Sequence, residues 1–186
     1  MKEAAATMVS NFKVGAANSH VALMTFSSSA RSVFNFGRTY DPEKMKAEIS
    51  GLAQDASAES NVARALDVAR TDLFSLKGRS RRGIAKAFLL ITQGPFSVAK
   101  AAIIQKSADK LKLAMGGVEI IPVFIGNKNG ADAKLIESMA TTSVSTSTKK
   151  FFQFDTTSDL LKNADLLKIS SAACSGELSI SRYFEI

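Results

Sequence analysis

The chain has 186 residues and a net charge of +7, with 46% hydrophobic residues. This balance excludes wholesale disorder, and the length suits one soluble domain with a full hydrophobic core. No apolar run approaches the roughly 20 residues of a membrane helix. A single cysteine, Cys174, excludes an internal disulfide, and a single histidine, His20, opens an apolar run where a catalytic base would be poorly placed.

The first part of the chain predicts a helix, two strands and two further helices. Apolar spacing is helical over residues 2–13. A continuous apolar run at 20–26 indicates a strand covered on both faces, and the period-two pattern at 32–37 indicates an edge strand beside it. An aspartate followed by proline starts a helix over 41–52, and a second amphipathic helix is expected over 62–74.

The rest of the chain alternates strands with helices. Gly116 and Gly117 end a long helix because glycine adopts the left-handed backbone that other residues resist. Pro122 lies in the strand that follows and indicates an edge position or a bulge, since proline lacks the N–H of a ladder donor. The expected elements are a strand at 84–92, a helix at 97–114, a strand at 118–126, a helix at 132–140, a strand at 150–154 and a helix at 158–173.

This alternation predicts an α/β fold with a Rossmann-like, doubly wound, mostly parallel sheet flanked by helices. Binding sites in such sheets lie beyond the carboxyl ends of the strands, at the topological switch point. The chain has no glycine-rich phosphate loop, and its carboxylates are scattered over expected helix surfaces. A catalytic function is therefore not expected.

A basic loop follows the second amphipathic helix and contains Lys77, Arg79, Arg81 and Arg82. Such a loop is most simply a solvated surface. It could also bind an anionic partner, such as a sulfated glycan or an acidic protein, or serve as a cleavage site for a protease. No aromatic residue is interleaved with the arginines and no nucleic-acid motif accompanies them, so nucleic acid is not an expected partner.

Several segments, in this order, resemble the von Willebrand factor type A (VWA) domain. Residues 21–31 and the edge strand after them are similar to its second and third strands. Asn-Val-Ala-Arg-Ala-Leu at 61–66 resembles its Thr-Asn-Thr-Gly-Lys-Ala-Leu segment, and Leu-Leu-Ile-Thr-Gln-Gly at 89–94 resembles Leu-Leu-Thr-Asp-Gly. Residues 123–127 and 135–140 resemble its penultimate strand and following helix. The resemblance covers residues 1–167 and implies the doubly wound fold of that family.

The resemblance also implies that the groups holding a metal ion are depleted here. The family's first, central strand ends in Asp-x-Ser-x-Ser, which supplies three oxygen ligands of the metal-ion-dependent adhesion site, and this motif does not occur in the chain. Ser60 stands at the family's threonine ligand position and Gln93 at its aspartate, where an amide brings no charge to a hard cation. Magnesium binding is expected only if the missing N-terminal motif is supplied. Otherwise the polar rim, if it functions, contacts a protein partner without metal, through Ser27, Ser60, Asn61, Gln93 and Gly94.

The absent first strand has two explanations. The chain is a fragment of a longer, secreted protein, in which case Cys174 stands where the family's flanking disulfide would have its second cysteine. Alternatively, residues 177–184, which alternate with period two, fill the vacant central position. The domain is accordingly placed at 1–174, as N-terminally incomplete, and residues 175–186 form an extension with a possible extra strand.

The resemblance implies a non-catalytic protein-interaction module of the extracellular-matrix or cell-adhesion type, with a protein ligand such as a matrix protein. The alternative is an intracellular member of the family that serves as a scaffold within a complex. A secreted location is expected if the chain is a fragment, and a cytoplasmic one if it is complete as given.

Overall fold

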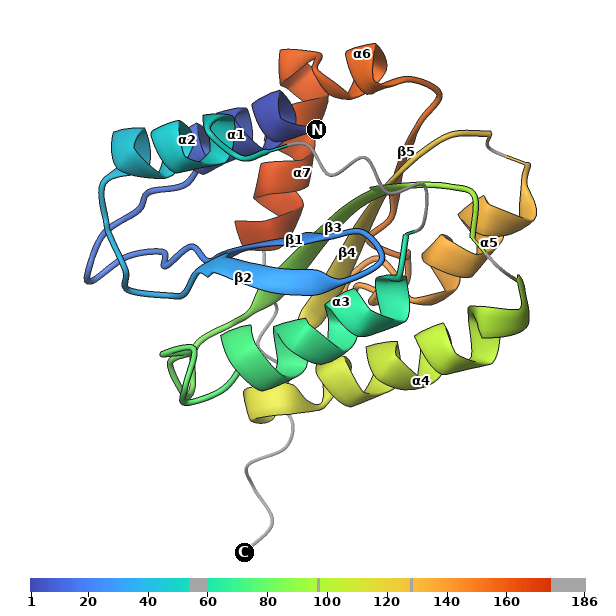
Figure 1. Cartoon of the computed structure of the whole chain (residues 1–186), viewed down its shortest axis with the longest axis horizontal. Helices are drawn as coiled ribbons and strands as arrows, with labels where there is room; N and C mark the ends of the chain where they lie inside the picture. The colour runs from blue at the N-terminus through green and yellow to red at the C-terminus, as the bar shows by residue number, and fades with distance from the viewer. Residues whose placement is uncertain (54–59, 97, 128, 175–186) are drawn as a thin grey trace, which may run out of the picture.

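The computed structural model describes residues 1–53, 60–96, 98–127 and 129–174. Helices and strands alternate along most of this chain, and helices cover both faces of the sheet region (Figure 1). In chain order the elements are α1 (Lys2–Asn11), β1 (Leu23–Phe26), β2 (Ala30–Phe34), α2 (Pro42–Ser50), α3 (Val62–Val68), η1 (Ala69–Leu73), β3 (Ala87–Gln93), η2 (Val98–Lys100), α4 (Ala101–Lys112), η3 (Ala114–Gly116), β4 (Glu119–Ile125), α5 (Ala131–Ser138), β5 (Phe152–Phe154), α6 (Thr157–Leu160) and α7 (Asn163–Cys174).

The helix starts follow from side chains that bind free backbone N–H groups. Asp41 Oδ1 accepts hydrogen bonds from the N–H groups of Glu43 and Lys44, at 3.0 and 3.3 Å, and Pro42 takes the first helical position. Asn61 Oδ1 accepts from the N–H of Arg64 at 3.1 Å and caps α3. The start predicted at Asp41 is confirmed.

The strands form two sheets. β3, β4 and β5 make a parallel sheet with β4 in the middle, and β1 and β2 make an antiparallel hairpin. The β3–β4 ladder runs in register from Ala87 opposite Glu119 to Gln93 opposite Ile125. No strand of the described residues pairs with the second edge of β1 or of β3. The α/β class with a parallel sheet and flanking helices is confirmed, while the sheet itself is divided.

Two strand expectations need correction. Pro122 lies on the central strand β4, opposite Leu90, and not at an edge or bulge. It is tolerated there because β5 pairs only from Val123 onward, so on the β5 side the ladder begins after the proline. All four residues of β1 are half-buried, whereas a strand covered on both faces was expected. The reason is that β1 has a described partner strand on one side only.

The end of the chain also differs from its expectation. A single helix was predicted over 158–173, but two helices form, α6 and α7. The cap of α6 is Thr156, whose hydroxyl oxygen accepts from the N–H of Asp159 at 3.2 Å. Among the helices of the described residues, none has the length and apolarity to cross a membrane.

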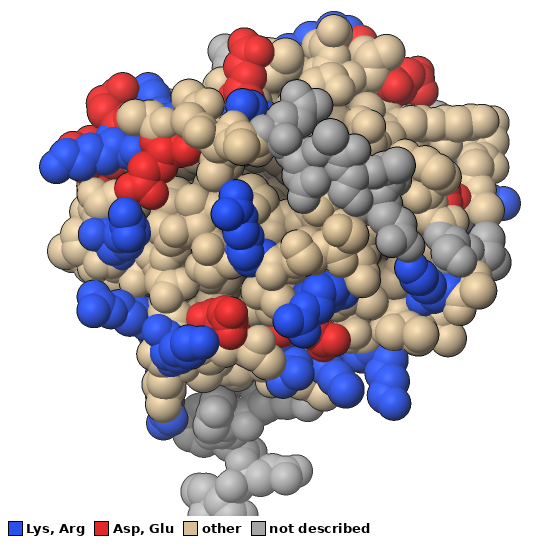
Figure 2. Space-filling model, in the orientation of Figure 1, with Lys and Arg blue, Asp and Glu red and all other residues tan. Residues whose placement is uncertain are grey.

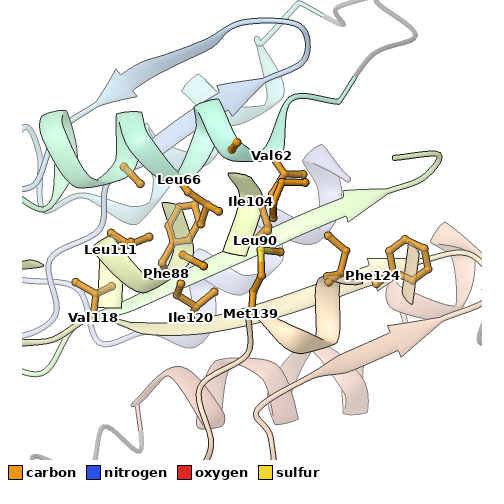
Figure 3. Close-up of a cluster of buried hydrophobic side chains, with 14 of the residues drawn as sticks. Val62, Leu66, Phe88, Leu90, Ile104, Leu111, Val118, Ile120, Phe124 and Met139 are labelled. Atoms are coloured by element: carbon orange, nitrogen blue, oxygen red, sulfur yellow. The ribbon is translucent and has the colours of Figure 1, made fainter. Parts of the chain in front are cut away.

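Alternate side chains of β4 enter two different cores, because successive residues of a strand point to opposite faces. Ile120 and Phe124 pack with α3 and α4, while Val123 and Ile125 pack with α1, α6 and α7. Figure 3 shows the first core, in which side chains of α3 and α4 converge on those of β3 and β4. Its labelled members are Val62, Leu66, Phe88, Leu90, Ile104, Leu111, Val118, Ile120, Phe124 and Met139.

Replacement of Ile120 tests this assignment of the core. Ile120 is fully buried, so Ile120→Ala is expected to lower the free energy of unfolding by about 3 kcal/mol through lost burial and the cavity left behind. The control is Leu113→Ala, because Leu113 is 80% exposed and its loss should cost less than about 0.5 kcal/mol. Urea unfolding measures both. Equal costs for the two variants would contradict the packing described here.

Candidate recognition rim

The predicted rim residues lie at the carboxyl ends of β1 and β3, and a hydrogen bond joins the segments around β1. The N–H of Asn61 donates to the carbonyl oxygen of Ser27 at 2.7 Å. This bond ties the turn after β1 to the start of α3, two segments that are far apart in the chain. In Figure 1 the β1–β2 turn and the start of α3 lie at the same end of the molecule as the end of β3.

Ser27 and Asn61 both make hydrogen bonds within the rim. Ser27 is buried, and its N–H donates to the carbonyl oxygen of Ser29 at 2.7 Å within the turn. The side chain of Asn61 is engaged as the cap of α3. Ser60, next to Asn61, is half-buried. We infer that these residues fix the shape of the loop more than they offer free groups to a ligand.

Gln93 and Gly94 form the second part of the rim. Gln93 is the last residue of β3 and is exposed to solvent. Gly94 packs directly against the carboxylate of Asp132, and any Cβ at this position would collide with Asp132 Oδ2. The close approach explains why glycine stands here.

Asp132 is a rim residue that the sequence analysis missed. Its Oδ1 accepts a hydrogen bond from the N–H of Phe96 at 3.2 Å, so the first turn of α5 holds the loop that follows β3. The available signal was a carboxylate in the first turn of the helix after the next strand, where acidic residues are common for reasons of helix electrostatics alone. Only the folded chain shows that this carboxylate lies against Gly94.

The donors at the rim do not suit a hard divalent cation. Mg²⁺ prefers carboxylates and water, and the rim offers the Ser60 hydroxyl, the Gln93 amide and one carboxylate, Asp132, that already accepts from a backbone N–H. Within the described residues, no three histidine, cysteine, aspartate or glutamate side chains gather as metal ligands. The family's metal site therefore does not fit these residues as they stand.

The four residues of the predicted basic patch, Lys77, Arg79, Arg81 and Arg82, make different contacts within the chain. Arg81 donates from Nη2 to the carbonyl oxygen of Asn18 at 2.7 Å, and Lys77 pairs with Asp72 at 3.6 Å. Arg79 has a φ of +61° and, together with Lys77 and Asp72, lines a shallow polar hollow beside β2. Arg82 is exposed. Figure 2 accordingly shows basic side chains interspersed with acidic ones on this face of the molecule.

A layered sheet with helices on both faces and a polar rim at the strand ends defines a doubly wound binding domain. The von Willebrand factor type A domain model matches residues 1–165, and the chain belongs to this family. No curated protein matches the chain by sequence.

Solved structures show the same fold. Proximal thread matrix protein 1 from the mussel byssus superposes with a TM-score of 0.78 at 23% identity, over 94% of this chain and 42% of that one. A second structure of that mussel protein, with a zinc-occupied MIDAS motif, gives a TM-score of 0.77 at 23% identity over the same shares. The manganese-loaded TRAP protein of Plasmodium vivax gives 0.63 at 15% identity, over 89% of this chain and 64% of that one. The chain thus spans less than half the length of the mussel protein.

The contact between Gly94 and Asp132 is open to a direct test. Gly94→Ala is expected to cost about 1–3 kcal/mol of stability, because the methyl group must displace the carboxylate. In an Asp132→Ala background the same change should cost less, since the colliding atoms are gone.

Gly51→Ala is the matched control for that pair. Gly51 has a φ of −75°, and the nearest atom to an added Cβ is the Ala47 carbonyl oxygen at 3.4 Å, so this change should shift stability by no more than about 1 kcal/mol. Thermal or urea unfolding measures all variants. An identical cost of Gly94→Ala with and without Asp132 would rule out the contact.

Proposed function

We propose that this chain is a non-catalytic protein-interaction module of the extracellular-matrix or cell-adhesion type, and that it binds its protein ligand through the rim without a metal ion. VWA domains are interaction modules that bind protein ligands.

The observation that carries the proposal is the chemistry of the rim. Its exposed part ends in the neutral amide of Gln93 and the exposed ring of Pro95, on a loop that Asp132 anchors through Phe96. Neutral amides both donate and accept hydrogen bonds, which suits the backbone and polar side chains of another polypeptide. A loop anchored in this way loses little conformational entropy on binding, so the contacts it makes contribute more fully to affinity.

The charge of the rim supports binding without metal. A cation that bridges a module to its ligand must be held by carboxylates on the module, and here an amide stands at the position that the family resemblance assigns to an aspartate, Gln93. Asp132 is the carboxylate nearest to Gly94, and one of its oxygens serves the backbone of Phe96. Direct hydrogen bonds and shape are then the means of recognition at this rim.

The extracellular assignment draws on a structural relative. The mussel protein is by its name a thread matrix protein, and it shares the fold over most of this chain. We propose on this basis that the chain acts in a matrix outside the cell.

Binding to purified matrix proteins tests the proposal. The chain is passed over surfaces of fibrillar collagen, fibronectin and laminin, and the proposal expects saturable binding to at least one. Gln93→Arg places a long cation on the exposed rim and should weaken that binding at least tenfold, on the order of 1.4 kcal/mol.

Two controls accompany the rim variant. Leu113→Arg adds the same side chain at an exposed site outside the rim and should leave binding unchanged. The triple variant Lys77→Glu, Arg79→Glu, Arg82→Glu separates rim recognition from general attraction to the basic loop. Loss of binding in this triple variant with none in Gln93→Arg would move the ligand site to the loop, and binding to none of the surfaces would reject the matrix assignment.

Metal dependence is measured separately by titration calorimetry with Mg²⁺ and Mn²⁺. The donor set predicts no binding tighter than about 1 mM, since a single engaged carboxylate and neutral oxygens hold such ions weakly. Addition of EDTA should leave binding to the matrix surface unchanged. Micromolar affinity for either ion, or release of the surface by EDTA, would contradict binding without metal.

A further inference from the structure

A cavity of about 450 Å³ lies between the β1–β2 hairpin and the β3–β4–β5 sheet. Leu23 and Met24 of β1 line one side of it, and Ala87 and Leu89 of β3 line the other. We call this cavity the strand groove. None of the predicted rim residues lines it, so binding in the groove is independent of binding at the rim.

The backbone of β3 presents hydrogen-bonding groups to the strand groove. The N–H of Glu119 in β4 donates to the carbonyl oxygen of Lys86 at 2.8 Å, and in a parallel ladder alternate residues of a strand face the same neighbour. Lys86 and every second residue after it therefore face β4. The groups on the opposite side belong to Ala87, Leu89 and Ile91, and no strand of the described residues pairs with that side.

β1 and β3 lie in one layer of the fold. Met24 and Phe88 both pack in the core beneath α3 and α4. Leu23 and Leu89 both pack on the side that α1 covers. Side chains alternate between the two faces of a sheet, so strands that share both layers of side chains lie edge to edge. The groove is thus a gap within a sheet, and an unpaired strand edge is a template for another strand.

The side chains around the groove determine which strand fits. One face of an inserted strand meets the rings of Phe36 and Phe74, and the other meets Met8 and Phe12 of α1. A strand covered on both faces is apolar at successive positions, not only at alternate ones. An apolar small molecule suits the groove less well, because it leaves the free backbone groups of β3 without hydrogen-bond partners.

The groove is cationic at one end. Of the described residues that line it, Arg81 and Lys86 carry a positive charge and none is acidic. Arg81 binds the carbonyl oxygen of Asn18, ahead of β1, and Lys86 directly precedes β3. Burial lowers the pKa of the Lys86 ammonium group because the charge loses hydration, and a carboxylate nearby offsets that loss. A complementary strand therefore carries an acidic residue at the end that reaches Lys86.

We propose that the strand groove binds an extended segment of a partner protein, which enters as a strand parallel to β1 and β3 and joins the two sheets. The segment is apolar over about five residues, because the free edge from Ala87 to Ile91 has that length, about 16 Å. Its amino end carries an acidic residue. The parallel direction follows from the helices on both faces, since sheets covered in this way are characteristically parallel.

The described strands of this chain do not supply such a segment to a second copy. β2 contains Arg31, and β5 has only three residues and follows Lys150. Either strand would bring a cation to a groove that already holds Arg81 and Lys86, and like charges repel. A separate polypeptide with an acidic and apolar segment is the complementary occupant.

Residue-resolved hydrogen exchange tests the insertion, with a synthetic peptide as the probe. The peptide is acetyl-Glu-Val-Val-Ile-Val-Ala-Gly-Lys-Lys-amide, whose lysines extend beyond the groove and keep it soluble. Saturating peptide should slow exchange of the Ala87, Leu89 and Ile91 amides at least tenfold, while the alternate amides that already pair with β4 change less. No added protection of these three amides overturns the proposal.

A peptide with proline in place of its central isoleucine is the matched control. Proline keeps the apolar character but removes a ladder donor. Titration calorimetry should show at least tenfold weaker binding of this peptide. Equal affinity of the two peptides would show that the cavity binds apolar ligands without strand pairing, and would overturn the proposal.

A charge exchange tests the orientation of the segment. Lys86→Glu should weaken binding of the glutamate peptide at least tenfold, and a peptide with lysine as its first residue should regain affinity for that variant. Lys110→Glu is the matched control, because it makes the same change at an exposed site outside the groove and should leave binding unchanged. Absence of rescue overturns the parallel orientation proposed here.

Analytical ultracentrifugation of the full chain identifies a competing occupant. A monomer is expected without peptide, and a one-to-one complex with it. A dimer that dissociates when the peptide is added would show that a second copy of the chain supplies the strand, and this result overturns the proposal of a separate partner.

Discussion

The parallel ladder between β3 and β4 is the interaction on which the rest of the described fold depends. It pairs seven residues in register, and it holds together segments separated by the whole of α4. Because β4 also pairs with β5, its side chains are buried on both faces, and each face nucleates a separate hydrophobic core. Loss of that ladder would separate α3 and α4 from α1 and α7, since no large contact of the described chain joins those two layers except through the sheet region.

The same ladder positions the recognition rim. In a parallel sheet the carboxyl ends of the strands lie at one edge, and the loops after β3 and β4 therefore meet there. Gly94 lies in the loop after β3 and Asp132 in the first turn of α5, which follows the loop after β4, and their contact fixes the backbone that follows Gln93. The hairpin of β1 and β2 reaches the same edge by a different route, through the bond from Asn61 N–H to the Ser27 carbonyl oxygen. The rim is thus built by backbone and side-chain contacts that leave few charged groups exposed to a ligand.

Among the described residues, the strands form the β1–β2 hairpin and the β3–β4–β5 sheet, and no backbone ladder joins the two. The β1–β2 hairpin packs through Phe34 on α1 and α2, and through Met24 and Phe26 on the core beneath α3, so it is held by side chains and not by a ladder to β3. Side-chain packing alone leaves β1 half-buried along its whole length. The cavity beside it is a consequence of this arrangement.

The sequence by itself determined the kinds of element and their order, because helix caps, glycine stops and apolar periodicity act within a few residues. The cap at Asp41 and the family resemblance were readable in this way. The predicted glycine stop was less exact, because α4 ends at Lys112 and the left-handed backbone begins at Met115, before Gly116 and Gly117. Tertiary structure alone decided that Pro122 sits on a central strand, that the sheet is divided, and that Asp132 anchors the loop beside Gly94. Those features depend on which distant segments share backbone hydrogen bonds and on contacts between side chains far apart in the chain. Local sequence patterns do not determine either.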